Sequence, residues 1–141
     1  AYRRAHPKES PTDIWFRYGT DREARWNSVK QAELQLAQNP AVYMYSFDWN
    51  TPLVDGKIKA FHTAELPLAL RLVRFPESES LSKQIATAWA SFARSGNPKW
   101  PRYDLKSRAT MVFDAPVGKV VNDPGREARL LQQNNRPEGP L

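Results

Sequence analysis

The segment Ala41–Trp49 constrains the fold more than any other part of this chain. It is apolar almost throughout, without the alternation of a half-exposed strand, which is the pattern of a strand covered on both faces. Such a strand needs neighbours in the sheet. The sequence offers Ala109–Phe113 and Lys119–Val121, which we expect to pair as a short hairpin across Pro116 and Gly118; neither resembles a doubly covered partner. We therefore predict an α/β fold that is incomplete by itself, a central strand with flanking helices whose sheet continues elsewhere.

Helix start and stop signals organise the N-terminal third of the chain. Ser10 followed by Pro11 is a typical helix start, because the serine caps free backbone N–H groups and proline suits the first helical position. Gly19 predicts the end of this helix. Thr20 with Glu23 three residues later forms a capping box, so we expect a second helix to begin there.

The clearest helix spans residues 80–95, where a broad apolar stripe runs along one face and Gly96 closes the C-terminus. The predicted division of residues 1–141 is a linker at 1–9, helices at 10–38, a central strand at 41–49, a histidine-bearing loop at 50–70, a helix at 80–95, a small hairpin and helix at 109–131, and a tail at 132–141.

His62 is the residue with the strongest claim to chemistry. It is one of only two histidines, and it lies on a loop after the apolar strand, where sheet-based hydrolases present a general base. Such a base needs a nucleophile within reach and an acid on its other nitrogen. No Gly-x-Ser-x-Gly turn occurs in the sequence, so the nucleophile is not visible here. A structural role for His62 remains the alternative.

Composition and charge exclude several classes of function. The net charge is +6, yet the basic residues are scattered among acidic ones, which disfavours a nucleic-acid partner. Two distant histidines and no cysteine argue against a metal site, and a cytoplasmic bacterial protein is favoured over a secreted one. No apolar run approaches the roughly 18 residues of a membrane span. Asp48 and Asp55 near the strand end suggest paired carboxylates of a glycosidase, but such aspartates more often form turns.

The 16 aromatic residues, including five tryptophans, are many for a chain of this length. Large aromatic surfaces in a short chain indicate faces that are covered by ligand or by more protein.

Several sequence blocks occur together and in order along most of the chain. They are Thr20-Asp21-x-x-x-Arg25-x-x-Ser28, Val42-Tyr43-Met44-Tyr45-x-Phe47-Asp48-Trp49, Ala60-Phe61-His62-x-x-Glu65-Leu66-Pro67, Ala88-Trp89-x-x-Phe92-Ala93-Arg94-x-Gly96-Asn97-Pro98 and Val121-Asn122-Asp123-Pro124. In this combination the chain resembles the C-terminal region of type-B carboxylesterases, in the para-nitrobenzyl esterase and cholinesterase-like branch of the α/β hydrolases. The resemblance runs from about Tyr2 to Leu131.

The resemblance implies an α/β-hydrolase fold and a Ser-Glu-His triad that cleaves carboxylic esters without metal or organic cofactor. His62 matches the triad histidine, and the serine and the acid lie outside this region. Glu65 matches a structural acid beside the site. Phe61, Leu66 and Leu68 either line the acyl or alcohol pocket or belong to the core.

The partners that the resemblance implies are a small carboxylic ester and the remainder of the hydrolase domain, with no nucleic acid and no membrane. Homo-oligomers are the expected alternative if the chain stands alone, because an unpaired central strand leaves apolar area exposed. The alternative function is that of a non-catalytic, esterase-like binding or interaction module.

Overall fold

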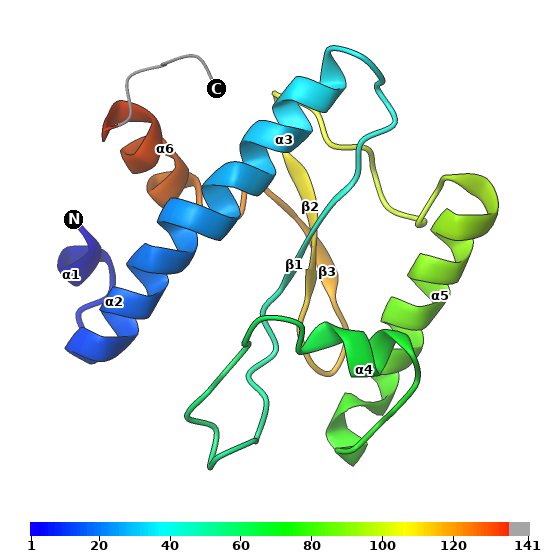
Figure 1. The fold of residues 1–141 in the computed structure, drawn as a ribbon, viewed down its shortest axis with the longest axis horizontal. Helices are drawn as coiled ribbons and strands as arrows, with labels where there is room; N and C mark the ends of the chain where they lie inside the picture. The colour runs from blue at the N-terminus through cyan, green and yellow to red at the C-terminus, as the bar shows by residue number, and fades with distance from the viewer. Residues whose placement is uncertain (136–141) are drawn as a thin grey trace. The chain divides into compact units, whose positions relative to one another are not determined.

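The computed structural model describes residues 1–135, and most of the predicted tail at 132–141 lies outside them (Figure 1). Two compact units make up the chain. One comprises Ala1–Gln38 together with the segment from Gly125 onward, and the other comprises Asn39–Pro124.

The first unit is helical. Its elements are α1 (Tyr2–Ala5), α2 (Pro11–Thr20), a π-helical segment η1 (Asp21–Arg25), α3 (Trp26–Leu36) and α6 (Arg126–Asn135). The predicted start at Ser10 is confirmed, because its side chain accepts a hydrogen bond of 3.1 Å from the backbone N–H of Asp13. Pro11 occupies the first turn of α2, as expected.

The predicted break at Gly19 is wrong. Thr20 has helical backbone angles (φ −60°, ψ −48°) and makes no capping bond, so α2 continues into η1 and then into α3. A glycine inside a helix costs only about 1 kcal/mol. Asp21, which is buried, accepts hydrogen bonds from the Tyr2 hydroxyl (3.1 Å) and from Nε of Arg25 (3.0 Å). These contacts stabilise the helical path through the position where the sequence predicts an end.

The Tyr2 contact also changes the description of residues 1–9. Its ring packs edge-on against Tyr18 at a centroid distance of 5.6 Å, and burial followed by the charge of Asp21 raises the pKa of its hydroxyl. The segment predicted as a linker therefore begins with a packed helical turn.

The second unit is built on a three-stranded sheet. Strand β1 (Met44–Phe47) pairs in parallel with β2 (Ala109–Phe113), and β2 pairs antiparallel with β3 (Lys119–Asn122). The predicted hairpin is confirmed. Our interpretation that Ala109–Phe113 does not resemble a doubly covered strand is wrong, because all five of its residues are buried. Its polar member, Thr110, tolerates burial by donating a 3.0 Å hydrogen bond to the backbone carbonyl of Arg108.

Strand β1 is the edge of this sheet within residues 1–135, with β2 on one side only. Its residues are only partly buried, and Tyr45 is 40% exposed. The sequence of β1 is nearly all apolar, as in a central strand. Within the described residues, however, β1 lies at the edge of the sheet.

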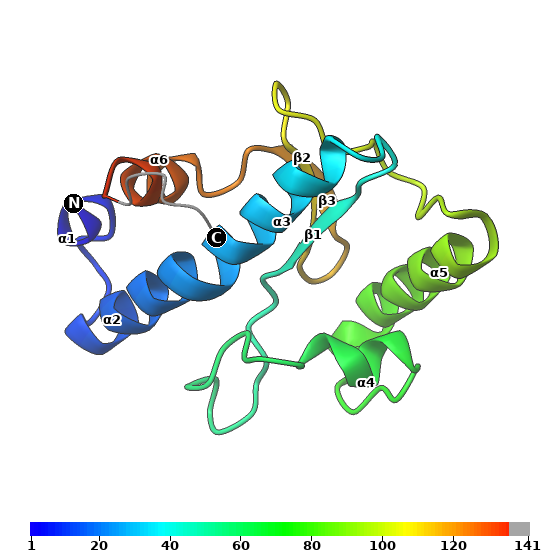
Figure 2. The same ribbon diagram turned by 45° about the horizontal axis from the view of Figure 1, so that its top comes forward.

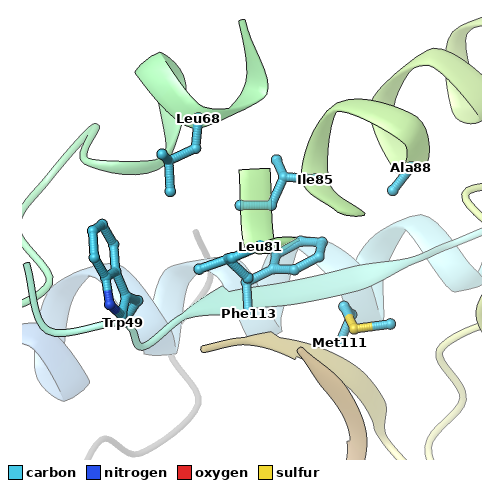
Figure 3. Close-up of a cluster of buried hydrophobic side chains, with 7 residues drawn as sticks. All are labelled: Trp49, Leu68, Leu81, Ile85, Ala88, Met111 and Phe113. Atoms are coloured by element: carbon cyan, nitrogen blue, oxygen red, sulfur yellow. The ribbon is translucent and has the colours of Figure 1, made fainter. Parts of the chain in front are cut away.

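The core lies between the sheet and two helices, α4 (Glu65–Ala69) and α5 (Glu79–Ser95), with the short 3₁₀ helix η2 (Pro76–Ser78) leading into α5. Figure 2 shows α4 beside α5. Figure 3 shows the seven buried side chains that meet there: Trp49, Leu68, Leu81, Ile85, Ala88, Met111 and Phe113. Helix α5 ends at Gly96, which has the left-handed conformation (φ +67°), as predicted.

The turn between β2 and β3 is fixed to α5 by a reciprocal pair of hydrogen bonds. Nε2 of Gln84 donates to the carbonyl of Gly118 (3.0 Å), and the N–H of Gly118 donates to Oε1 of Gln84 (2.7 Å). The backbone packs tightly at this point. A methyl group on Gly118 would lie 2.7 Å from the backbone oxygen of Val112 and 3.0 Å from Cα of Phe113.

We expect Gly118→Ala to destabilise the second unit by about 1–3 kcal/mol, because the new methyl meets backbone atoms that cannot rotate away. The matched control is Gly19→Ala, where the added methyl meets nothing within 4 Å inside a helix and should stabilise the first unit by about 0.5–1 kcal/mol. Urea denaturation followed by circular dichroism measures both effects. Equal stability of G118A and the parent chain would contradict the tight packing of this turn.

Candidate functional site

His62 lies in an exposed turn between the loop that follows β1 and the start of α4. The turn is closed by two backbone hydrogen bonds of 3.1 Å each, from Ala64 to the carbonyl of Phe61 and from Leu66 to the carbonyl of Thr63. The Thr63 hydroxyl donates to the carbonyl of His62 at 2.6 Å. The turn thus presents the imidazole to solvent on a backbone that is bonded on both sides.

Thr63, the residue after His62, has a left-handed backbone with φ of +67°. This is an outlier for a β-branched residue, and such strain costs about 1–3 kcal/mol. It persists only where the surroundings fix the backbone, and the neighbouring Ala64 is buried. Strain of this kind is concentrated at functional sites.

Glu65 is the first residue of α4, and Oε1 of its half-buried side chain accepts a 3.3 Å hydrogen bond from the Tyr45 hydroxyl of β1. Burial raises the pKa of Tyr45, and the charge of Glu65 and this hydrogen bond raise it further. The neutral phenol is therefore favoured in the fold, so its stabilising contribution is present below about pH 10 and is lost as the pH rises through the raised pKa. No hydrogen bond joins Glu65 to His62 in the part of the chain that is described.

The three predicted pocket residues separate into two kinds. Phe61 and Leu66 are 39% and 40% exposed, on either side of the His62 turn. Leu68 is buried in the core cluster with Trp49 and Leu81, which is the second of the two roles expected for it. The structure thus brings Phe61 and Leu66 to the surface near His62 and places Leu68 beneath it.

A second hollow, not predicted from the sequence, lies between β1 and α5. We call it the aromatic groove; it has a volume of about 350 Å³, and its lining includes Tyr43, Tyr45, Trp89, Phe92, Pro98 and Trp100. Centroid distances of 6.1 Å for Tyr43–Phe92 and 6.4 Å for Tyr45–Trp89 show that the rings of strand and helix meet there. The signal in the sequence was the spacing of the aromatic residues: Tyr43, just before β1, and Tyr45 are two residues apart, and Trp89 and Phe92 are three apart on α5.

Trp100 carries the one buried side-chain donor without a hydrogen-bond partner among residues 1–135, its indole Nε1. A buried donor without an acceptor costs about 1–3 kcal/mol. This donor belongs to one of the residues that line the groove, but it is itself buried.

Within residues 1–135, no group of three or more histidine or acidic side chains is placed to hold a metal ion. None of the helices described is both long and apolar enough to cross a membrane.

Comparisons with known proteins bear on the whole chain. Residues 3–127 match the model of the Carboxylesterase family. The para-nitrobenzyl esterase of Bacillus subtilis is 37% identical over 117 residues, which are 72% of this chain and 23% of that protein. The human cocaine esterase is 33% identical over 112 residues, which are 67% of this chain and 20% of that protein. The chain therefore spans about a quarter of the length of these relatives.

Solved structures give the same result for the fold. The carboxylesterase of Geobacillus stearothermophilus superimposes with a TM-score of 0.79 at 31% identity, over 94% of this chain and 30% of that one. A Clostridium hathewayi esterase gives a TM-score of 0.62 at 27% identity, over 94% of this chain and 28% of that one. The mixed sheet and its helices are thus part of an α/β-hydrolase fold, as predicted, and this chain belongs to the carboxylesterase family.

Proposed function

We propose that this chain supplies His62 as the general base of a serine carboxylesterase. The observation that carries the proposal is the position of His62 on an exposed turn after β1, within the region that matches the Carboxylesterase family. The exposed Phe61 and Leu66 around it support a site there. The substrate class is a carboxylic ester, and Phe61 and Leu66 contact its apolar part.

The proposed reaction is acyl transfer in two halves. A serine attacks the ester carbonyl while His62 accepts the serine proton, and the protonated imidazole then donates that proton to the departing alcohol. Water repeats the cycle on the acyl-enzyme and releases the acid. A carboxylate on the other ring nitrogen of His62 orients the imidazole and stabilises its charged form.

Two members of this triad come from outside residues 1–141. The sequence has no Gly-x-Ser-x-Gly turn for the nucleophile. Glu65, the acid nearest in sequence, is bound to Tyr45 and not to His62. We therefore infer that the serine and the glutamate belong to the remainder of the hydrolase domain.

Two features of the second unit support such a partner. Strand β1 has a free edge within residues 1–135, and free edges of apolar strands pair with further strands. The aromatic groove lies against the same strand, and its walls are mostly aromatic side chains. Additional strands and helices of one hydrolase domain would cover both.

A tagged fluorophosphonate, which labels reactive serines, tests the proposal in the native polypeptide that carries this segment. We expect a labelled band several times heavier than 16.2 kDa, the mass of the chain itself. The control is the isolated chain, which should remain unlabelled and show no turnover above that of free imidazole. Labelling of the isolated chain would contradict the missing nucleophile, whereas an unlabelled native protein would favour the non-catalytic binding module.

A further inference from the structure

We propose that Tyr45 is a positioning residue for His62, because its hydroxyl fastens the first residue of α4, and with it the His62 turn, to strand β1. The bond is the 3.3 Å contact from the Tyr45 hydroxyl to Oε1 of Glu65, which joins residues 20 apart in sequence. The inference rests on the proposed role of His62 and identifies a contact that holds its turn in place.

The segment also has attachments on both sides of the His62 turn. Between β1 and α4 the chain forms turns, and the 3.3 and 2.8 Å bonds from the backbone N–H and the hydroxyl of Thr51 to the carbonyl of Lys59 close that loop on itself. Further along α4, Leu68 is held in the core and its carbonyl accepts a 2.8 Å bond from Ser82. Glu65 thus lies three residues from His62, and its side chain is bound to another element of the second unit.

Tyr45 is a firm anchor for this bond. Its ring packs against Phe113 of β2 at 5.7 Å and against Trp89 of α5 at 6.4 Å between centroids. Its backbone lies in the β1–β2 register opposite Met111. Packing of the ring restricts the position of its hydroxyl and so of the carboxylate that it binds, and hydrogen bonds to charged groups are stronger than those between neutral groups. The short helix α4 then passes that restriction to the turn three residues upstream.

Four substitutions separate positioning from a general loss of stability. Tyr45→Phe removes only the hydroxyl, and Glu65→Ala removes the acceptor. Glu65→Gln keeps an acceptor oxygen and should rescue the bond. Tyr43→Phe is the matched control. It removes a hydroxyl from the residue just before β1, and the Tyr43 ring contacts Phe92 and Trp100.

The first measurement is amide hydrogen exchange, by mass spectrometry, of peptides covering residues 61–66 in the native polypeptide. We expect exchange about fivefold faster in Y45F and E65A, which corresponds to the net value of one hydrogen bond. The exchange rates in E65Q and Y43F should stay within about twofold of the parent, because both variants keep this hydrogen bond. Unchanged exchange in Y45F and E65A overturns the proposal, as does equal acceleration in E65Q, because the bond would then not be what holds the turn.

The second measurement is steady-state ester hydrolysis by the same polypeptide. A misplaced base lowers kcat and leaves KM unchanged, so Y45F should lose about fivefold in kcat, in line with one hydrogen bond. Faster exchange with unchanged kcat, while H62Q is inactive, overturns the positioning role alone. Activity retained in H62Q overturns the proposed function first and the positioning role with it.

Discussion

Replacing His62 with glutamine is expected to lower kcat/KM for carboxylic esters by about three orders of magnitude in the polypeptide that carries this segment. General-base catalysis contributes about 10²- to 10⁴-fold, and a triad loses nearly all of its function when one member is removed. Glutamine fills a similar volume and forms hydrogen bonds, but it cannot accept the serine proton at neutral pH. The measurement is the initial rate with a chromogenic ester, beside labelling by a fluorophosphonate.

The matched control is His6→Gln, which removes the other histidine of the chain. His6 lies at the end of α1 with Nδ1 3.8 Å from Oε1 of Glu9, and its loss should leave kcat/KM unchanged. A further variant, Thr63→Gly, relieves the left-handed strain next to His62 without touching the imidazole. If H62Q hydrolyses esters within tenfold of the parent protein, another residue is the base.

The sequence predicted best those features that depend on near neighbours. The cap at Ser10 and the left-handed end at Gly96 depend on one turn of backbone, and the β2–β3 hairpin joins adjacent segments. The continuous path through Gly19 and Thr20 was not predicted because Asp21 finds one of its partners in Tyr2, 19 residues away. A capping signal is outweighed when the fold supplies such contacts.

The parallel pairing of β1 with β2 shows the same limit at longer range. Tyr45 and its register partner Met111 are 66 positions apart in the sequence. Helices α4 and α5 lie between these two strands in the sequence, and the pairing of the strands depends on how the helices pack. No local sequence pattern encodes that packing. Thr110 is polar although it is buried, so the sequence of β2 lacks the continuous apolar pattern of a covered strand.

The site was predicted only as far as single residues allow. Position after an apolar strand was sufficient to single out His62, and the structure places that residue on an exposed turn. Its catalytic role stays a prediction. The Tyr45–Glu65 bond and the aromatic groove could not be predicted because each joins β1 to a helix far along the chain. Leu68 could be placed only once the core was known.

The second large effect concerns that core. Leu81→Ala should destabilise the second unit by about 3–5 kcal/mol, because it removes a side chain that is 0% exposed and leaves a cavity among residues that cannot close around it. Leu81 lies in the first turn of α5, close to both α4 and the sheet (Figure 3). A whole domain is stable by only about 5–15 kcal/mol, so this loss would unfold much of the unit at moderate temperature.

Urea denaturation followed by tryptophan fluorescence measures this effect, since Trp49, one of the five tryptophans of the chain, belongs to the same cluster. Leu72→Ala is the matched control: the same three-carbon deletion in the same unit, at a side chain that is 64% exposed and should cost within about 0.5 kcal/mol. The contrast between the two leucines separates core packing from the general effect of losing apolar carbons. If both variants lose the same stability, the side chain of Leu81 is not packed as the structure has it, and α4, which bears the His62 turn, rests on something other than this core.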